Sequence, residues 1–179
     1  MEQLDKLVLI CVETNKKTKT DVFYINKALK FLYKKEPRTK IDYVYMDGKH
    51  KYNNKNTLAS IEEKSSQFSE KHIVYCIDTD DIFVDSKHIN LNDEIEQYCN
   101  KNNYELVWFC RNIEEVFLHR IVIDKNKVLE AKRFGAISEI SPSVINSLKA
   151  NIKSKTKSNF KCIFDKYLEI KKDEDEENK

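Results

Sequence analysis

Four short apolar segments, separated by longer amphipathic segments, constrain the fold of this chain most strongly. The apolar segments lie at residues 6–13, 41–46, 72–77 and 104–110, and each predicts a buried strand. The segments between them, at residues 20–35, 54–70 and 91–100, carry apolar side chains at helical spacing. Alternation of strand and helix predicts an α/β fold with a mostly parallel four-stranded sheet flanked by helices.

The pattern changes after residue 110. Residues 113–123 predict an amphipathic helix, although their β-branched side chains leave a strand open, and residues 144–152 and 160–170 predict further helices. We therefore expect an α/β core at residues 1–110, a helical extension at residues 111–170 packed on that core, and a disordered charged tail at residues 171–179.

Composition excludes several classes of protein. The chain has only two glycines, Gly48 and Gly135, which excludes glycine-rich phosphate loops of the Walker and dinucleotide-binding kinds. No apolar run approaches the ~20 residues that cross a bilayer, and the first residues lack the basic region of a signal peptide. The five cysteines show no CxxC spacing and are expected as buried free thiols. We expect a cytoplasmic protein that does not contact membranes.

Carboxylates follow two of the predicted strands. Glu13 ends the first strand, and Asp78, Asp80 and Asp81 follow the third. In an open parallel sheet, ligands bind beyond the carboxyl ends of the strands, where the strand order reverses. If strands one and three are neighbours, these side chains meet there.

A shared divalent cation would explain why several carboxylates lie so close together. Magnesium prefers oxygen ligands, and two aspartates with one residue between them at a strand end would point to the same side. The alternative is that the aspartates form an ordinary turn and helix cap, a role that we assign to Asp81.

Two other aspartate chemistries fit less well. Haloacid-dehalogenase-like phosphatases carry their DxD on the strand that opens the fold, whereas here it follows the third strand. Phosphoacceptor receiver domains need an acidic pair after strand one, whereas Glu13 is followed by Thr14.

A glutamate after strand one and a DxD after strand three resemble the Toprim domain of topoisomerases, primases and nucleases. More narrowly, the chain resembles the RloB-like (AbiL-type) branch, whose members lie beside restriction and phage-defence genes. The matching residues are Glu13, Thr20-Asp21, Tyr24-Ile25, Asp78 and Asp80, with Asn112 and Glu115 as a looser match to a later Asn-Pro…Phe-Glu segment. The chain departs from the branch in having Thr14 after the glutamate and about three residues inserted before Thr20.

The resemblance implies a Toprim-like fold and a Mg²⁺- or Mn²⁺-dependent nuclease or phosphodiester-transfer module, acting on DNA or RNA in phage defence. It implies that Glu13 acts in acid/base chemistry or as a metal ligand. It also implies that Asp78 and Asp80 hold the metal, and that Glu115 adds a ligand.

Basic side chains are candidates for contacts with nucleic acid. Lys16, Lys17 and Lys19 lie in the segment that follows Glu13, while Arg111, Lys132 and Arg133 are candidates to spread charge in the transition state. Residues 149–161 contain five lysines and no acid, which suits either a phosphate backbone or a solvated face. His119 lies four residues after Glu115 and is either a base or ligand or, more simply, a satisfied histidine.

Two other functions remain open. One is a catalytically inactive Toprim-like subunit that binds or regulates, working with a partner ATPase as the resemblance implies. The other is a simple α/β nucleotide-binding domain. A metal-dependent enzyme predicts that Glu13, Asp78 and Asp80 lie within a few ångströms of one another. An inactive subunit predicts that they point apart or are neutralised by lysine.

Overall fold

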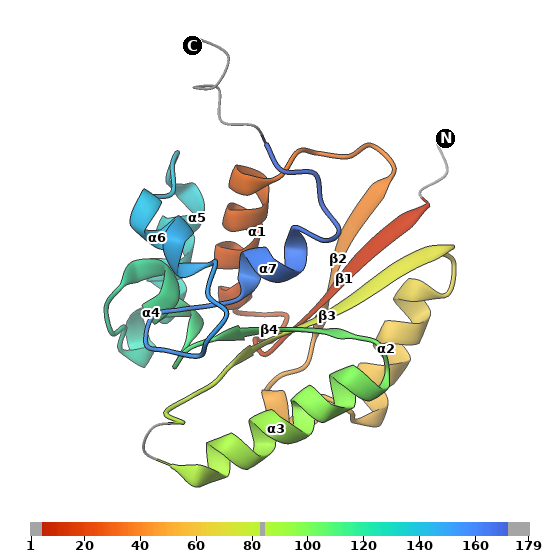
Figure 1. Cartoon of the computed structure of the whole chain (residues 1–179), viewed down its shortest axis with the longest axis horizontal. Helices are drawn as coiled ribbons and strands as arrows, with labels where there is room; N and C mark the ends of the chain where they lie inside the picture. The colour runs from red at the N-terminus through yellow and green to blue at the C-terminus, as the bar shows by residue number, and fades with distance from the viewer. Residues whose placement is uncertain (1–4, 83–84, 172–179) are drawn as a thin grey trace.

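A parallel sheet of four strands forms the centre of the structure (Figure 1). The computed structural model describes residues 5–82 and 85–171. The strand order is β2 (Thr39–Tyr45), β1 (Lys6–Val12), β3 (Glu70–Asp78) and β4 (Glu105–Phe109), and every neighbouring pair is parallel. The order reverses between β1 and β3, so the two strands that precede the predicted carboxylates are neighbours.

Helices cover both faces of the sheet. One face carries α2 (Lys55–Ser65) and α3 (Ser86–Lys101). The other carries α1 (Thr20–Leu32), α4 (Ile113–Leu118), α5 (Lys127–Ala136), α6 (Pro142–Ser147) and α7 (Phe160–Phe164). Single 3₁₀ turns, η1 (Lys49–Lys51) and η2 (Asp124–Asn126), precede α2 and α5. The predicted α/β class, with a parallel sheet and C-terminal helices, is confirmed.

Strand β1 contributes side chains to both faces, which explains its uninterrupted apolar sequence. Val8, Ile10 and Val12 belong to the core under α1, and Leu7, Leu9 and Cys11 belong to the core under α2 and α3. All six are fully buried. Because each large buried side chain contributes about 1.5–3 kcal/mol, β1 anchors both cores and holds the residue that follows it in place.

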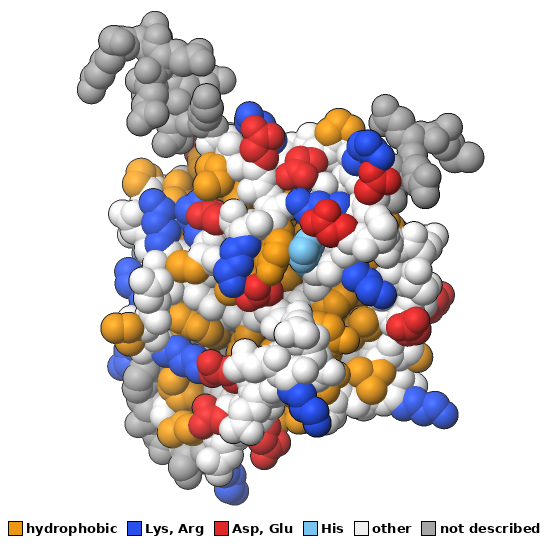
Figure 2. Space-filling model, turned by 45° about the vertical axis from the view of Figure 1, so that its right-hand side comes forward, with side chains coloured by type: hydrophobic (Ala, Val, Ile, Leu, Met, Phe, Trp, Pro, Cys, Tyr) orange, Lys and Arg blue, Asp and Glu red, His pale blue; other side chains and the backbone are white. Residues whose placement is uncertain are grey.

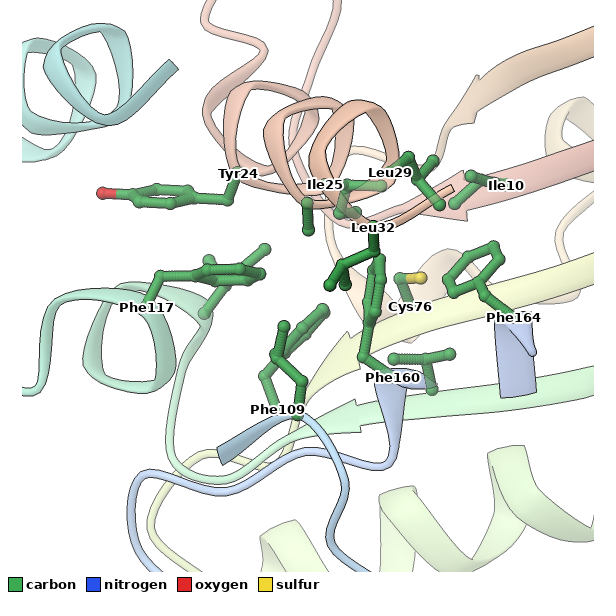
Figure 3. Close-up of a cluster of buried hydrophobic side chains, with 14 of the residues drawn as sticks. Ile10, Tyr24, Ile25, Leu29, Leu32, Cys76, Phe109, Phe117, Phe160 and Phe164 are labelled. Carbon is green, nitrogen blue, oxygen red and sulfur yellow. The ribbon is translucent and has the colours of Figure 1, made fainter. Parts of the chain in front are cut away.

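The core under α1 contains a group of packed aromatic side chains (Figure 3). Tyr24 of α1 stacks on Phe117 of α4, with ring centroids 5.5 Å apart, and packs at 5.1 Å against Phe134 of α5. Phe160 of α7 lies 6.5 Å from Phe109 of β4. The C-terminal helices and α1 therefore bury one another's apolar surface and are stabilised together.

Several helix boundaries differ from the sequence prediction. Helix α3 begins at Ser86, and its N-cap is Asp85, whose side chain accepts a hydrogen bond from the Lys87 N–H at 2.9 Å. The capping role expected for Asp81 was therefore wrong. Helix α4 ends at Leu118 because His119 adopts the left-handed conformation, with φ 53°.

Helix α5 was not predicted at all. It buries only Ala131 and Phe134, a stripe too thin to be recognised in the sequence. The predicted charged tail lies outside the described residues from residue 172 onward. No helix in the described ranges is long and apolar enough to span a membrane. All five cysteines are free as expected; four of them are buried, whereas Cys162 is only half-buried.

Candidate functional site

Glu13 and Asp78 meet beyond the carboxyl ends of β1 and β3. Oε1 of Glu13 accepts a hydrogen bond from the backbone N–H of Asp78 at 2.7 Å. This contact crosses the point where the strand order reverses, which is where the sequence placed the site. The predicted convergence of these two residues is therefore present.

The two aspartates of the DxD pattern do not point to the same side, contrary to expectation. Asp78 is the last residue of β3, and its Oδ1 accepts a hydrogen bond from the N–H of Ile113 at 2.9 Å, at the start of α4. Asp80 adopts the left-handed conformation with φ 54°, which breaks the alternation of the strand. Its carboxylate instead lies 2.6 Å from Nζ of Lys49 and 3.4 Å from Nδ1 of His88.

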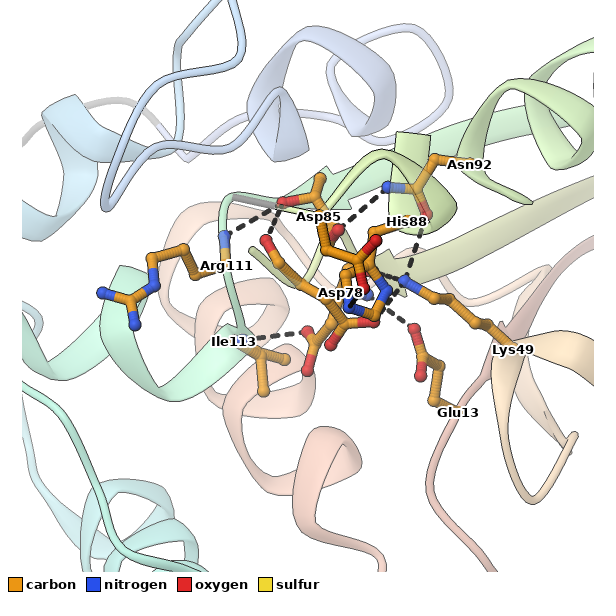
Figure 4. A network of polar contacts seen from close by, with 10 residues as sticks. Glu13, Lys49, Asp78, Asp85, His88, Asn92, Arg111 and Ile113 are labelled. Carbon is orange, nitrogen blue, oxygen red and sulfur yellow. Dashed lines mark hydrogen bonds and ion pairs between the residues drawn. The ribbon is translucent and has the colours of Figure 1, made fainter. Parts of the chain in front are cut away.

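Glu13, Asp80, Lys49 and Asn92 form one part of the site, which we call the Lys49 cluster (Figure 4). Lys49 lies in η1 and is only 6% exposed. Besides contacting Asp80, its Nζ donates hydrogen bonds to the carbonyl oxygen of Asp78 at 2.7 Å and to Oδ1 of Asn92 at 3.1 Å. The amide of Asn92 donates to the carbonyl of Thr79 at 2.9 Å, so its oxygen is directed at Lys49.

Asp21, Asp78, Glu114 and Lys127 form the other part, which we call the Glu114 cluster. Asp21, in the first turn of α1, accepts a hydrogen bond from the N–H of Thr14 at 3.0 Å. Nζ of Lys127 lies 3.8 Å from Oε2 of Glu114, too far for a hydrogen bond. Glu114 is 3% exposed, and among the described residues its Oε2 is a buried side-chain oxygen without a hydrogen-bond partner.

Burial raises the pKa values of these carboxyl groups, and repulsion between Glu13 and Asp78 adds to the effect. Burial raises the pKa of Glu13 to about 8, because the charge of Lys49 and the N–H of Asp78 offset burial only in part and Asp21 and Asp80 add repulsion. Burial, and then the negative charge of Glu13, holds the pKa of Asp78 well above its usual value.

The same shift extends through the Glu114 cluster. Burial raises the pKa of Asp21 and of Glu114, although Lys127 lowers both in part. Burial opposes the charged form of Lys127, but Glu114, Asp78 and Asp124 raise its pKa overall. The carboxyl groups at this edge of the sheet therefore retain protons to a higher pH than exposed carboxyls do.

The donor chemistry of the Glu114 cluster fits a hard divalent cation. Its donors are carboxylate oxygens, which Mg²⁺ and Mn²⁺ prefer, and Oε2 of Glu114 has a free coordination position. As the side chains stand, no three His, Cys, Asp or Glu residues within residues 5–82 and 85–171 are arranged to hold a metal ion. An ion would therefore require the carboxylates to rotate towards one another.

Glu115, expected as a metal ligand, instead binds Asn112, the N-cap of α4. Its N–H donates to Oδ1 of Asn112 at 2.9 Å, and Nδ2 of Asn112 donates back to Oε1 of Glu115 at 3.1 Å. Arg111 lies 3.4 Å from Glu115 and 3.9 Å from Asp81, and its guanidinium extends away from the side of the site that holds Lys49 (Figure 4). Of the two neighbouring glutamates, Glu114 and not Glu115 contributes to the raised pKa of Asp78.

The other basic candidates are exposed on the β1–α1 loop and on α5. Lys16, Lys17 and Lys19 are exposed in the β1–α1 loop, between Glu13 and Asp21. Lys132 and Arg133 are exposed on α5, and Arg133 pairs with Glu130 at 3.0 Å.

His119 has ordinary partners. Its Nε2 lies 3.0 Å from Oγ of Ser147, and its Nδ1 lies 3.4 Å from Oγ of Ser143. These contacts agree with the simpler interpretation of a satisfied histidine.

Sequence reasoning missed Lys49, Asn92, Glu114 and Lys127 as site residues. A signal existed for Lys49, because it follows the Asp47-Gly48 turn after β2 and so leaves the same edge of the sheet as Glu13. Glu114 and Glu115 are neighbours in the sequence and point in different directions from α4. Which of them faces the site depends on the residue at which α4 begins. Lys127 had no signal, because its helix was not predicted.

No family model matches the chain, and no curated protein or solved structure matches it either.

Proposed function

We propose that this chain is a Mg²⁺- or Mn²⁺-dependent nuclease or phosphodiester-transfer module of the Toprim, RloB-like type, acting on nucleic acid in phage defence. The observation that carries the proposal is the convergence of Glu13 and Asp78, together with Asp21, Asp80 and Glu114, at the point where the strand order reverses. An excess of partly buried carboxylates at this position is typical of a site that works with a cation.

Glu13 is suited to proton transfer. A pKa of about 8 lies close to the pH of the cytoplasm, so the carboxyl can both give up and accept a proton there. Its hydrogen bond from the N–H of Asp78 fixes one oxygen, and the other remains available to a reacting group. We assign Glu13 the acid/base role.

Asp78, Asp21 and Glu114 are the residues that would hold the metal ion. When bound, the ion would neutralise charge on the phosphodiester and lower the pKa of a coordinated water. Asp78 interacts electrostatically with both Asp21 and Glu114. Glu114 contributes the oxygen that has no hydrogen-bond partner among the described residues.

Nucleic acid would reach the site through the exposed loop that carries Lys16, Lys17 and Lys19. Arg111, Lys132 and Arg133 are further candidates for contacts with phosphate. On the face drawn in Figure 2, positive and negative side chains of the described residues are interspersed, which favours binding through this loop rather than across that face.

Metal-dependent cleavage of plasmid DNA and of RNA tests this proposal. The wild-type chain should cleave at least one of them in Mg²⁺ or Mn²⁺ and lose activity in EDTA, and Asp78→Ala/Asp80→Ala should be inactive. Glu63→Ala, an exposed change on α2, is the matched control and should cleave like the wild type. Equal cleavage by the wild type and the double variant would contradict the proposal.

A catalytically inactive binding or regulatory subunit, working with a partner ATPase, is the second candidate. It is favoured by the ion pair between Asp80 and Lys49 and by the use of Asp78 to bind the N–H of Ile113, because both contacts occupy carboxylates that a metal would need. This function predicts no cleavage by the wild type and no change in its melting temperature with Mg²⁺.

A further inference from the structure

The ammonium of Lys49 has a complete set of partners. It has three N–H donors, and three oxygens lie within hydrogen-bond distance, at 2.6 Å, 2.7 Å and 3.1 Å. They are a carboxylate oxygen of Asp80, the backbone carbonyl of Asp78 and the side-chain amide oxygen of Asn92. These three oxygen types also bind hard metal ions in proteins. The ammonium therefore occupies a position built for a cation.

Two of the residues at this position, Lys49 and Asn92, are largely closed to water, whereas the Asp80 side chain is 43% exposed. Lys49 is 6% exposed and Asn92 is 4% exposed. Because the Nδ2 of Asn92 is held by the carbonyl of Thr79, rotation of the amide away from Lys49 would break a second hydrogen bond. A buried ammonium with unmade hydrogen bonds would be strongly unfavourable, so these contacts hold the charge in place.

The chain that carries Lys49 is fixed directly to β1. The N–H of Gly48 donates to the carbonyl oxygen of Glu13 at 2.8 Å. Gly48 has φ 108°, and a Cβ at this position would lie 2.7 Å from the ring of His50. Glycine is therefore needed for the turn that directs Lys49 towards Asp80.

We infer that Lys49 is the permanent cation of this half of the site, so that a divalent ion binds at the Glu114 cluster and not between Asp80 and Glu13. Lys49 is then a positioning residue: it holds Asp80 in place and compensates the charge of Asp80 without metal. The inference rests on the proposed function only for the ion at the Glu114 cluster.

Lys127 does not close the Glu114 cluster in the same way. Its ammonium lies 3.8 Å from Glu114, and its side chain is 33% exposed, compared with 7% for Lys49. A metal ion that enters the Glu114 cluster can therefore displace the Lys127 ammonium into water. An ion that enters the Lys49 cluster would lie beside an ammonium that stays buried, and the two positive charges would repel each other.

Counting bound Mn²⁺ by electron paramagnetic resonance of the free ion tests the inference. Lys49→Met should bind one Mn²⁺ more than the wild type. Its affinity for Mn²⁺ at the position vacated by the ammonium, beside Asp80, should be at least tenfold higher than that of the wild type at the same position. Lys49→Met/Asp80→Asn should lose that gain. Lys49→Gln, which keeps a polar side chain near Asn92, serves as a second variant if Lys49→Met does not fold.

The stoichiometry separates the two proposals. A wild type that binds no Mn²⁺, with Lys49→Met binding one, would support the role of Lys49 and overturn the proposed metal function. A folded Lys49 variant that binds no more Mn²⁺ than the wild type would overturn the role of Lys49 and leave the metal function standing.

A measurement on the wild type avoids the question of folding. The ¹⁵Nζ signal of the Lys49 ammonium should remain at its position while diamagnetic Mg²⁺ is added to saturation. Disappearance of the signal, or a shift to the position of a solvent-exposed lysine, would show that the ion displaces Lys49 and would overturn the inference.

Discussion

The Lys49 cluster and the Glu114 cluster share one edge of the sheet but hold their charge differently. In the Lys49 cluster the ammonium lies 2.6 Å from its carboxylate and has all of its hydrogen bonds. In the Glu114 cluster the ammonium lies 3.8 Å away, and a buried carboxylate oxygen has no partner. The difference shows that a neighbouring lysine does not by itself satisfy an acidic cluster: the Lys49 cluster has all of its contacts, whereas the Glu114 cluster keeps a buried oxygen without a hydrogen-bond partner.

Neutralising one aspartate at a time is the most sensitive test of whether the two clusters differ in function. Asp78→Asn should lower metal-dependent cleavage by at least about a hundredfold, because Asp78 belongs to the cluster that we propose as the metal site. Asp80→Asn should lower it by about tenfold or less, because Asp80 contacts Lys49 and His88 and lies outside the proposed metal site. Initial rates at saturating Mg²⁺ measure both. Equal losses would show that the clusters are not distinct in function.

Removing each lysine charge should separate the clusters in stability. Lys49→Met should lower the free energy of unfolding by about 2–3 kcal/mol, somewhat less than for a fully buried pair because the Asp80 side chain is 43% exposed. Lys127→Met should lower it by less than about 1 kcal/mol, since its pair is long and partly exposed. Urea unfolding at pH 7 without divalent ions measures both, and the reverse order would contradict the comparison.

Stability should fall as the pH rises, because the folded chain retains protons that the unfolded chain has released. Glu13 has its ordinary pKa when unfolded and a pKa of about 8 when folded. Between about pH 4.5 and pH 8 it should therefore lower the free energy of unfolding by up to ~1.4 kcal/mol per pH unit. The raised pKa values of Asp78, Asp21 and Glu114 act in the same direction.

Urea unfolding at intervals from pH 5 to pH 8, without divalent ions, measures this slope. Glu13→Gln should have a shallower slope than the wild type, while the exposed change Glu63→Gln should leave it unaltered. Stability of the wild type that is flat or rising over this range would show that the carboxylates are not protonated in the folded state.

The smallest expected effect concerns charge outside both clusters. Lys16→Gln/Lys17→Gln should reduce the slope of log affinity against log salt by about 2 for a duplex, because each phosphate contact contributes about 0.9. Lys132→Gln/Arg133→Gln is the matched pair on α5, and a reduction confined to that pair would place the nucleic acid over α5 instead. Fluorescence anisotropy across a range of salt concentrations measures both.

The sequence was sufficient to predict the parallel sheet and, on the condition that strands one and three are neighbours, the edge where the acids meet. Continuous apolar strands and their order determine these features, and Glu13 and Asp78 then follow from adjacency alone. The direction of each carboxylate could not be predicted. It depends on one backbone conformation, the positive φ of Asp80, which aspartate adopts without a distinctive sequence signal.

Partners that come from short or irregular elements were also beyond sequence reasoning. Lys49 lies in a single 3₁₀ turn, and Lys127 opens a helix with only two buried residues. Glu114 was missed because choosing between it and Glu115 requires the start of α4 to within one residue. Helix periodicity locates a face of the molecule, but a charged contact depends on single positions.

Because the two faces of the sheet have separate cores, the two clusters can also open separately. Lys127 and Glu114 belong to α5 and α4, which pack with α1, whereas Lys49 and Asn92 lie on the side of α2 and α3. A local unfolding event that releases α5 would remove the cation of one cluster while the hydrogen bonds of Lys49 persist. Amide hydrogen exchange should therefore show that α4 and α5 lose protection together, before β1 and β3 do. Access to the Glu114 cluster would then be governed by the local stability of α5, a helix distant in sequence from either strand.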